Sequence, residues 1–330
     1  MTDKSQSVGR YFDAVVLERR ELTERIVELR IGALDGSALQ STEPGSHVEL
    51  QFGGSSGRFL RQYSLVGPVN LGGQREPFWR VAVQRENRNR GSAHIHSYFR
   101  VGTRIRASQP IATFRLAQRH THVLLIAGGI GITPILPMVR SLVIRQQSFT
   151  ALYLGTSRDT MAYADEVATM AGDNVRIHET HRDGRINLGE LLAFQPPGTA
   201  AYVCGPSSLI EAVQGCASEH SWDLKRVRFE VFNAAHRFDD VNFVVRLKTG
   251  QAISVKAGTT ALDAMEALKI DTLSDCRRGE CGLCVTDVIN AYEGVDHRDN
   301  YLTPDEKRMN TQMAICCSRA IGPVIELALS

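Results

Sequence analysis

The sequence predicts a multidomain α/β and β protein whose parts follow one another along the chain. Three observations support this: short strand-like runs punctuated by glycine and proline in the first third, strand–helix alternation in the middle, and clustered cysteines near the C-terminal end. We expect domains at residues 1–114, 115–232 and 241–330, with residues 233–240 as a linker. A chain of 330 residues is long enough to bury two or three hydrophobic cores.

The first domain is expected to be a small antiparallel β-barrel. Its apolar or alternating runs have the length of strands, and no long helical pattern separates them. These runs are Phe12–Leu17, Thr23–Ile31, His47–Phe52, Gln62–Val66, Trp79–Gln84 and Arg104–Ala107.

The second domain alternates strands with helices, which is the pattern of a parallel α/β sheet. Its expected strands are His122–Ala127, Thr150–Leu154, Val175–Glu179 and Ala200–Cys204. Its expected helices are Thr133–Val143, Ala162–Ala171 and Ser207–Ala217.

The last domain begins with a hairpin signal, because Val241–Leu247 and Ala252–Val255 flank a Thr249–Gly250 turn. A short helix, Thr260–Leu268, follows the hairpin, and Val324–Leu329 forms a closing strand. A cysteine-rich loop lies between that helix and that strand.

Composition and charge exclude several classes of protein. Hydrophobic residues make up 43% of the chain, charged residues 22%, and the formal net charge is only +2. We therefore expect no nucleic-acid or membrane partner. The longest apolar run, around Val123–Ile126, has the length of a strand, whereas a membrane span needs roughly 18–20 residues. Met1–Arg10 is polar and lacks a signal-peptide core, so we expect a cytoplasmic location, and we also expect a monomer.

Four of the seven cysteines have the spacing of a plant-type [2Fe–2S] site. Cys276, Cys281 and Cys284 form C-x4-C-x2-C, and Cys316 follows. A zinc site would usually pair two C-x2-C-like knuckles, and only one is present. The odd cysteine count also argues against a disulfide framework in a cytosolic chain.

Two glycines in the cysteine loop support the cluster interpretation. Gly279 and Gly282 permit a tight turn whose backbone N–H groups can point at the cluster sulfurs. Such hydrogen bonds help to set the reduction potential of a cluster.

A glycine-rich turn follows the first strand of the second domain and opens a helix, as a dinucleotide-binding turn does. Its glycines would let a pyrophosphate approach backbone N–H groups at the helix N-terminus. The turn differs from the Rossmann fingerprint, because a proline replaces the third glycine and suits a first helical turn. Such turns also serve as plain connectors. The residues are Gly128-Gly129-Ile130-Gly131-Ile132-Thr133-Pro134.

A second turn, Cys204-Gly205-Pro206, lies between the last strand and the last helix of the same domain. Ligands of open α/β sheets collect at the carboxyl ends of strands, so two such turns together predict a nucleotide site. Cys204 is explained equally well as a small buried residue.

One barrel strand carries a weaker signal for a flavin. Arg61 can bind a phosphate, Tyr63 can stack on a planar ring, and Ser64 can hydrogen-bond a ring nitrogen. Surface strands often carry such residues. Gly91-Ser92 opens a short helix that runs to about Arg100 and offers a further phosphate seat.

In their order, these motifs resemble those of the phthalate dioxygenase reductase family, within the wider ferredoxin–NADP reductase group. The resemblance covers about Tyr11–Leu329. It implies a barrel that binds FMN, a parallel domain that binds NADH, and a β-grasp ferredoxin domain with a [2Fe–2S] cluster. It implies an enzyme that passes electrons from NADH to the Rieske oxygenase component of a mono- or dioxygenase.

Two alternatives remain open at this point. A reductase for a cytochrome P450 would differ only in its partner. A non-catalytic redox- or nucleotide-sensing module is disfavoured by the complete set of nicotinamide, flavin and cluster motifs.

The resemblance also implies roles for residues. The R-x-Y-S motif, which holds the flavin phosphate and ring, matches Arg61, Tyr63 and Ser64, and the C-G-P motif beside the nicotinamide matches Cys204, Gly205 and Pro206. The glycine turn matches G-G-x-G-x-T-P, at Gly128, Gly129, Gly131, Thr133 and Pro134.

A further motif of the family, E-x-F, matches Glu230 and Phe232, and its phenylalanine ring is expected against the flavin. Among all these residues we expect Ser64, Cys204 and Phe232 to serve catalysis.

The resemblance selects the fourth cluster ligand and shows one departure. The closing motif C-x-S-R-A matches Cys316–Ala320, which implies Cys316 and not Cys317 as the ligand. Successive side chains of an extended stretch point to opposite faces, so only one of the two thiols would face the cluster. The family usually has R-G-G-S where this chain has Asn89-Arg90-Gly91-Ser92, and the guanidinium of Arg90 could itself bind phosphate.

Extraction of the flavin should yield FMN and not FAD. FMN is implied by the resemblance, and Arg61 with the Gly91-Ser92 helix start could hold its phosphate without an adenine pocket. Chromatography of the released flavin beside standards measures the outcome. Recovery of FAD as the sole flavin would contradict it.

Overall fold

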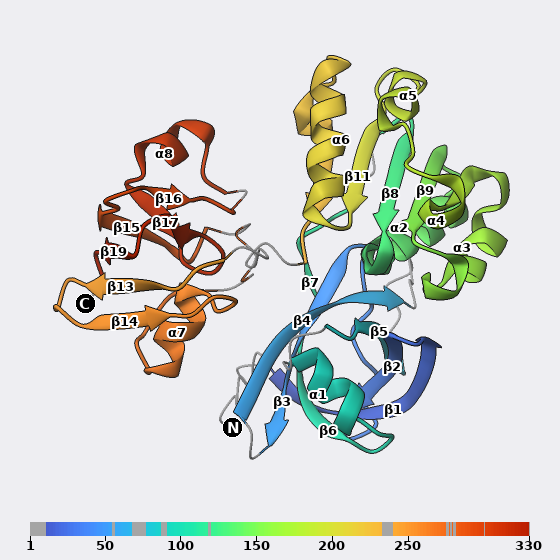
Figure 1. The fold of residues 1–330 in the computed structure, drawn as a ribbon. Coiled ribbons are helices and arrows are strands. Elements are labelled where there is room, and N and C mark those ends of the chain that lie inside the picture. Colours follow the sequence, from blue (N-terminus) through green and yellow to red (C-terminus); the bar gives the residue numbers. More distant parts are fainter. Residues whose placement is uncertain are drawn as a thin grey trace, which may run out of the picture. The chain divides into compact units, whose positions relative to one another are not determined.

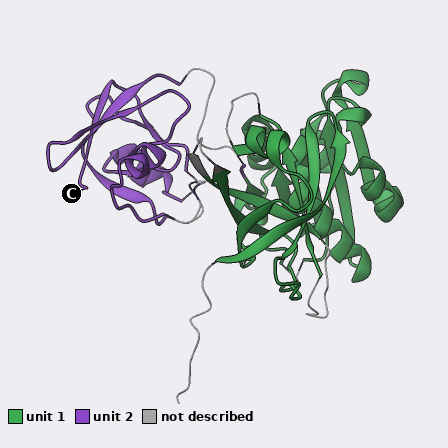
Figure 2. Cartoon of the chain, turned by 90° about the horizontal axis from the view of Figure 1, so that it is seen from below, with its two compact units in different colours: residues 1–230 green, residues 231–330 purple. Residues whose placement is uncertain are grey.

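The computed structural model describes residues 11–54, 57–67, 77–86, 91–117, 120–232, 240–274, 277, 279, 282–299 and 301–329. The chain forms two compact units, residues 1–230 and 231–330 (Figure 2). The first unit contains a barrel sheet and a parallel sheet, and the second contains a mixed sheet (Figure 1). The predicted fold class is therefore confirmed, whereas the division of the first unit at residue 114 stays a prediction.

The first sheet closes on itself into an antiparallel barrel. Its order is β4-β5-β2-β1-β6-β3-β7, and a further pairing of β4 with β3 closes the ring. The predicted strand runs lie in these strands, although Thr23 ends β1 and does not begin β2. The strands are β1 (Tyr11–Thr23), β2 (Ile26–Ala33), β3 (Ser46–Gly54), β4 (Gly57–Gly67), β5 (Trp79–Gln84), β6 (Arg104–Ser108) and β7 (Ile111–Ala112).

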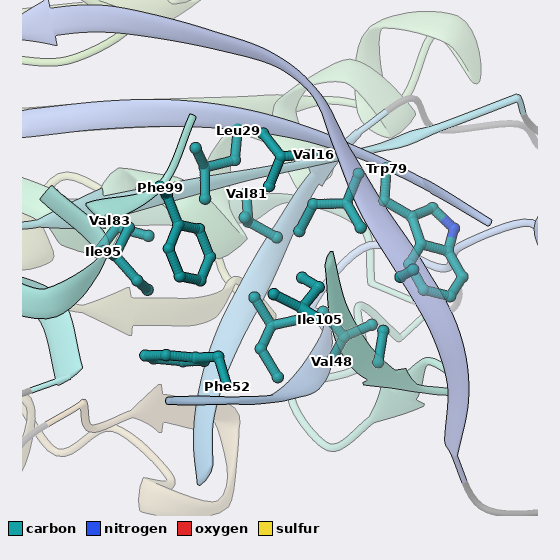
Figure 3. Close-up of a cluster of buried hydrophobic side chains, with 14 of the residues drawn as sticks. Val16, Leu29, Val48, Phe52, Trp79, Val81, Val83, Ile95, Phe99 and Ile105 are labelled. Carbon is teal, nitrogen blue, oxygen red and sulfur yellow. The ribbon is translucent and has the colours of Figure 1, made fainter. Parts of the chain in front are cut away.

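Apolar side chains from alternating strand positions fill the barrel (Figure 3). Leu29 and Ile31 of β2 are fully buried, as is Val81 of β5. Helix α1 (Gly91–Tyr98) adds the fully buried Ile95 to the same cluster. The barrel core and α1 are thus one packed body, which fixes the start of α1 relative to the strands.

The second sheet is parallel, with the order β10-β9-β8-β11-β12. The chain runs outward from β8 to β10 and then crosses back to β11 and β12, so the switch point lies between β8 and β11. All residues of β8 and β11 are buried, which explains their continuous apolar runs. The strands are β8 (Val123–Gly128), β9 (Phe149–Gly155), β10 (Val175–Glu179), β11 (Ala200–Cys204) and β12 (Val227–Glu230).

The helices of this sheet form two groups, since α2 packs against α3 and α5 packs against α6. Among the described residues, every helix falls short of the length and apolar character needed to cross a membrane. The α-helices are α2 (Ile132–Ile144), α3 (Ala164–Ala171), α4 (Thr180–Asp183), α5 (Leu188–Ala193) and α6 (Ser207–Glu219). Short 3-10 helices are η1 (Gly129–Gly131), η2 (Arg158–Thr160), η3 (Gly172–Asn174) and η4 (Leu224–Arg226).

The second unit contains a sheet of order β14-β13-β19-β15-β17. The predicted hairpin is confirmed, because β13 and β14 pair antiparallel, and the closing strand β19 lies parallel to β13. The strands are β13 (Phe243–Leu247), β14 (Ala252–Val255), β15 (Val285–Asn290), β17 (Gln312–Ala314) and β19 (Val324–Leu327), with a separate pair β16 (Val295–Asp296) and β18 (Arg319–Ala320).

Both helices of this unit have side-chain caps at their N-termini. In α7 (Ala261–Ala267), the hydroxyl of Thr260 accepts a hydrogen bond from the Asp263 amide at 2.9 Å. The helix α8 (Pro304–Met309) begins with a capping box and a proline, which the sequence analysis did not predict.

The end of the predicted linker is held inside the second unit. The side chain of Asp240 is 2% exposed and accepts a hydrogen bond of 2.6 Å from Arg298. The guanidinium of Arg319 lies 3.8 Å from the same carboxylate. Asp240 is therefore part of the packed body that follows it.

Leu29→Ala should lower the free energy of unfolding of the barrel by about 2–5 kcal/mol, because a fully buried leucine leaves a cavity. Leu17→Ala, on the neighbouring strand with 46% exposure, is the control and should change little. Denaturant midpoints of the two variants measure the difference. Equal losses in both would show that the barrel interior is not packed as described.

Candidate functional site

Two glycine-containing turns meet at the carboxyl ends of β8 and β11. A methyl group at Gly131 would lie 2.2 Å from the carbonyl oxygen of Cys204, so a residue with a Cβ does not fit. Gly129 has a φ of +56°, which L side chains rarely adopt. Since β8 and β11 flank the switch point, this is where an open α/β sheet binds its ligand. The structure thus brings into direct contact the two turns that together predict a nucleotide site.

The start of α2 is suited to an anion. No side chain among the described residues caps its N-terminus at Gly131. The hydroxyl of Thr133 donates to the carbonyl oxygen of Ile130 at 3.0 Å, which tightens the turn. Pro134 is buried in the first turn, where a missing N–H costs no helical hydrogen bond. Binding of a pyrophosphate at this turn stays a prediction.

Cys204 lies at the level of the same turns. It is aligned with Ala127 on one neighbouring strand and with Glu230 on the other. Cys204 is fully buried and Glu230 is 1% exposed. Pro206 then precedes α6, with the extended backbone of a helix-capping residue. The structure thus brings the C-G-P and glycine turns together with Glu230, while the chemical role of Cys204 stays a prediction.

Charged groups lie at the carboxyl ends of β9 and β10. The guanidinium of Arg158 pairs with the carboxylate of Asp165 at 2.5 Å. The backbone N–H of Arg158 donates to Glu179 at 2.9 Å, and Glu179 also pairs with Arg182 at 2.8 Å. The positive charge of Arg158 is therefore balanced by a carboxylate at the position where a ribose would lie in such a sheet.

The flavin motif lies on β4 beside the start of α1. A methyl group at Gly91 would lie 3.0 Å from Cγ and 3.2 Å from Nε of Arg61. The side chain of Arg61 therefore extends along the N-terminus of α1, so a cation and helix N–H groups converge as a phosphate requires. The hydroxyl of Ser92 accepts a hydrogen bond from the Glu86 amide at 3.2 Å. Asn89 and Arg90 lie outside the described residues.

The environment of Ser64 indicates whether β4 is suited to bind a flavin ring. Its hydroxyl is buried and has no hydrogen-bond partner among the described residues. A buried hydroxyl without a partner costs free energy, so a bound group with a ring nitrogen would relieve that cost. Burial also raises the pKa of the neighbouring Tyr63, which keeps its phenol protonated. The residues present thus fit a flavin.

The flavin strand and the nucleotide helix are neighbours, because β4 packs against α2. A second contact lies at Gly45, where a methyl group would be 1.9 Å from the Phe114 carbonyl oxygen and 3.1 Å from Met138 of α2. The barrel and the parallel sheet therefore meet through close packing, and their two predicted binding motifs lie on elements in direct contact.

In the second unit, two of the predicted cluster cysteines are described. Cys284 is 3% exposed and Cys316 is 1% exposed. The hydrogen bond between the two thiols raises the pKa of Cys284, and burial raises it further. Cys276 and Cys281 lie outside the described residues. The structure therefore brings one cysteine of the loop and one distant cysteine into contact.

Cys317, the neighbour of Cys316, is also buried, and its sulfur packs on Gly279 of the cysteine loop. The sulfur of Cys317 would lie 2.6 Å from a methyl group at Gly279, and it lies 3.8 Å from the carbonyl oxygen of Ala314. Gly279 and Gly282 have φ values of +76° and +77°, the left-handed region that glycine favours. Both values are compatible with the predicted tight turn, although residues 275, 276, 278, 280 and 281 of this loop lie outside the described residues.

One predicted contact is not described. Phe232 is half-buried and belongs to the second unit, whereas Glu230 ends the first. The expectation that the Phe232 ring faces the flavin stays a prediction.

Three residues of these sites carried no signal in the sequence. Leu209 of α6 packs on the joined turns so closely that a methyl group at Gly128 would lie 2.8 Å from it. The ring of Tyr301 packs on Gly282, where a methyl group would lie 2.3 Å from the ring. Asp165 pairs with Arg158 across one helical turn and a loop. No local pattern pairs Asp165 with Arg158, and none indicates the other two residues.

Comparisons with known proteins agree with the predicted family and fold. Residues 103–227 match the family described as the dimethylamine monooxygenase subunit DmmA-like N-terminal domain. Residues 245–320 match the 2Fe-2S iron–sulfur cluster binding domain. The chain is 35% identical to vanillate O-demethylase oxidoreductase from Pseudomonas sp. (strain HR199 / DSM 7063), over 96% of this chain and 99% of that protein.

Two solved structures resemble the whole chain. Phthalate dioxygenase reductase, described as a modular structure for electron transfer from pyridine nucleotides to [2Fe-2S], has a TM-score of 0.78 and 28% identity, and covers 97% of this chain and 98% of its own. An intact type IV self-sufficient cytochrome P450 monooxygenase has a TM-score of 0.68 and 31% identity, and covers 97% of this chain and 41% of its own.

Cys316→Ser should abolish the visible absorbance of an iron–sulfur cluster, while Cys317→Ser should retain it. The reason is the contact of the Cys316 thiol with that of Cys284, whereas the Cys317 sulfur faces the Gly279 backbone. Absorption spectra and iron content of the two purified variants measure the outcome. Loss of the cluster in Cys317→Ser alone would place the ligand one residue later.

Proposed function

The chain belongs to the phthalate dioxygenase reductase-like family, and from this premise we propose that it transfers electrons from NADH, through FMN and a [2Fe–2S] cluster, to a Rieske-type oxygenase component. The observation that carries the proposal is the contact between two motif-bearing elements, the flavin strand β4 and the nucleotide helix α2. A flavin accepts a hydride and releases electrons singly, which joins nicotinamide chemistry to a one-electron cluster.

The residues of the first unit bind and orient the two organic cofactors. Arg61 and the start of α1 hold the flavin phosphate, and the Ser64 hydroxyl donates to the flavin ring. The turn around Gly131 and the start of α2 hold the dinucleotide pyrophosphate. We expect Cys204 beside the nicotinamide and the Phe232 ring against the flavin.

The residues of the second unit hold the cluster. Its ligands are Cys276, Cys281, Cys284 and Cys316, all as thiolates. The left-handed turns at Gly279 and Gly282 let the loop wrap closely around the metal site.

The electron acceptor is an oxygenase component, and we propose that this component is of the Rieske type. The similarity to vanillate O-demethylase oxidoreductase supports an oxygenase system. The similarity to a self-sufficient P450 over 97% of this chain supports a haem oxygenase as the second candidate. A non-catalytic sensor is disfavoured because β4 and α2, the elements that carry the flavin and nucleotide motifs, are in contact.

We propose that the protein acts as a cytoplasmic monomer.

Reduction of ferricyanide and of cytochrome c by NADH tests this function. The purified holoprotein should reduce both acceptors, and loss of the cluster should abolish the reduction of cytochrome c more strongly than that of ferricyanide. A sensor would reduce neither. Reconstitution with a Rieske component and with a P450 then distinguishes the two partners by their rates of product formation.

Ser64→Ala should weaken flavin retention and slow flavin reduction about ten-fold or more, because it removes a buried hydroxyl aimed at the ring. Ser141→Ala, another buried serine without a partner among the described residues, is the matched control.

Phe232→Ala should alter the rate of flavin reduction, while Phe194→Ala, at 80% exposure, should not. Wild-type flavin content and stopped-flow rates in both test variants would contradict these roles.

NADH should have a higher kcat/KM than NADPH. Asp165 pairs with Arg158, and the carboxylate of Glu179 accepts from the Arg158 backbone, so a 2′-phosphate would meet negative charge there and would compete with Asp165 for Arg158. Asp165→Asn should raise kcat/KM for NADPH relative to NADH, and Asp173→Asn should not. A wild-type preference for NADPH would show that Arg158 is available to the phosphate.

A further inference from the structure

We propose that Glu28, Arg80, Tyr163, Glu166 and Arg140 form a positioning clamp that sets the nucleotide-binding sheet in register with the flavin barrel. The inference rests on the proposed function, because it concerns the geometry in which the two cofactors meet. None of these residues belongs to the motifs that bind cofactors. They act through the placement of the two bodies and touch neither reacting group.

Arg80 of β5 lies at the centre of the clamp. Its Nε donates to Glu28 of β2 at 2.9 Å, and its Nη1 and Nη2 donate to the two oxygens of Glu166 at 3.2 and 3.0 Å. Glu28 belongs to the barrel, and Glu166 belongs to α3 of the parallel sheet. The planar guanidinium therefore fixes the distance and the angle between the two bodies.

Two further contacts reinforce the same joint. Tyr163 is the residue just before α3, and its phenol donates to Glu28 Oε2 at 2.8 Å. Arg140 of α2 donates to Glu166 Oε1 at 2.7 Å. The clamp thus connects β2 and β5 of the barrel to α3 and α2, and α2 is the helix that begins at the glycine turn.

Burial makes the clamp sensitive to the loss of any partner. The side chains of Glu28 and Arg80 are only 1% and 13% exposed. Burial alone would raise the pKa of Glu166, but the hydrogen bond and charge of Arg80, with the charge of Arg140, hold that pKa below its usual value. Glu166 is therefore an anion at neutral pH, and its links to both arginines are charged.

Such a network is poorly explained as a device for stability alone. Desolvation of buried charges offsets much of their attraction, and well-packed apolar residues would serve stability equally well. Directional hydrogen bonds add what apolar contacts lack, which is a fixed register. A displacement of about 1 Å between reacting groups can slow a reaction about a hundred-fold, so register matters here.

The backbone at Tyr163 supports a role beyond packing. Its φ of +61° lies in the left-handed region, which is unfavourable for an aromatic residue. The strained conformation holds its ring beside Arg80, whose Cζ lies 5.4 Å from the ring centroid, and its hydroxyl on Glu28. Strain of this kind persists where the surrounding structure requires it.

Glu166→Gln tests the clamp in the holoprotein. The change keeps the shape of the side chain but removes its charge and weakens both arginine contacts. The rate of flavin reduction by saturating NADH should fall about ten-fold, while the dissociation constant for NAD⁺ should change less than about two-fold. Tyr163→Phe should act in the same direction, to a smaller extent. Glu18→Gln, which removes a surface pair with Arg30 at 2.7 Å, is the matched control and should match the wild type.

A second measurement does not depend on catalysis. Hydrogen–deuterium exchange of the flavin-free variants should rise in β2, β5 and the start of α3, and thermal unfolding of the barrel and sheet should separate into two transitions. A single transition at lower temperature with a wild-type rate of flavin reduction would show a merely stabilising role and overturn the proposal. Unchanged hydrogen–deuterium exchange together with an unchanged rate of flavin reduction would also overturn the proposal. If the wild type itself fails to oxidise NADH, the proposed function falls, while exchange and unfolding still decide whether the clamp couples the two bodies.

Discussion

The approach of two backbone turns at the switch point is the constraint on which the first unit depends. Gly131 lies so close to the Cys204 carbonyl that any side chain would push β8 and β11 apart. The strand order forces this meeting, because the chain leaves β8 on one side and returns to β11 on the other. Residues far apart in the sequence, including the buried Glu230, are thereby brought to the same edge of the sheet.

The joint between barrel and sheet uses a different kind of interaction. Within the parallel sheet, the two turns meet backbone against backbone. Between the barrel and the sheet, the contact at Gly45 consists of close packing against Phe114 and Met138. At Arg80 it consists of directional, charge-assisted hydrogen bonds. Packing excludes water without fixing one alignment, whereas the hydrogen bonds select an alignment. Together they give the two motif-bearing elements, β4 and α2, a defined relation within one compact unit.

Local patterns in the sequence were sufficient for much of this architecture. The barrel strands other than the two-residue β7, the parallel strands through β11 and the two glycine turns were predicted because each has a short-range signature. The strand β12 was missed, since its Val227–Glu230 run is short and half polar. The hydrogen bond between Tyr163 and Glu28 joins residues 135 positions apart, and no local rule pairs them. The distinction between Cys316 and Cys317 likewise came from motif matching, because the contacts of the two thiols depend on the folded chain.

The pairing of β4 with β3 has a consequence for association between chains. A ring of strands has no unpaired edge, so among the described residues the barrel offers only the two-residue β7 as a template for strand addition by another chain. The described edge strands of the other sheets are β10, β12, β14 and β17, together with the pair β16 and β18. A carrier that must repeatedly meet and release a redox partner is thereby shielded, over its flavin-bearing part, from the irreversible edge-to-edge pairing that leads to aggregation.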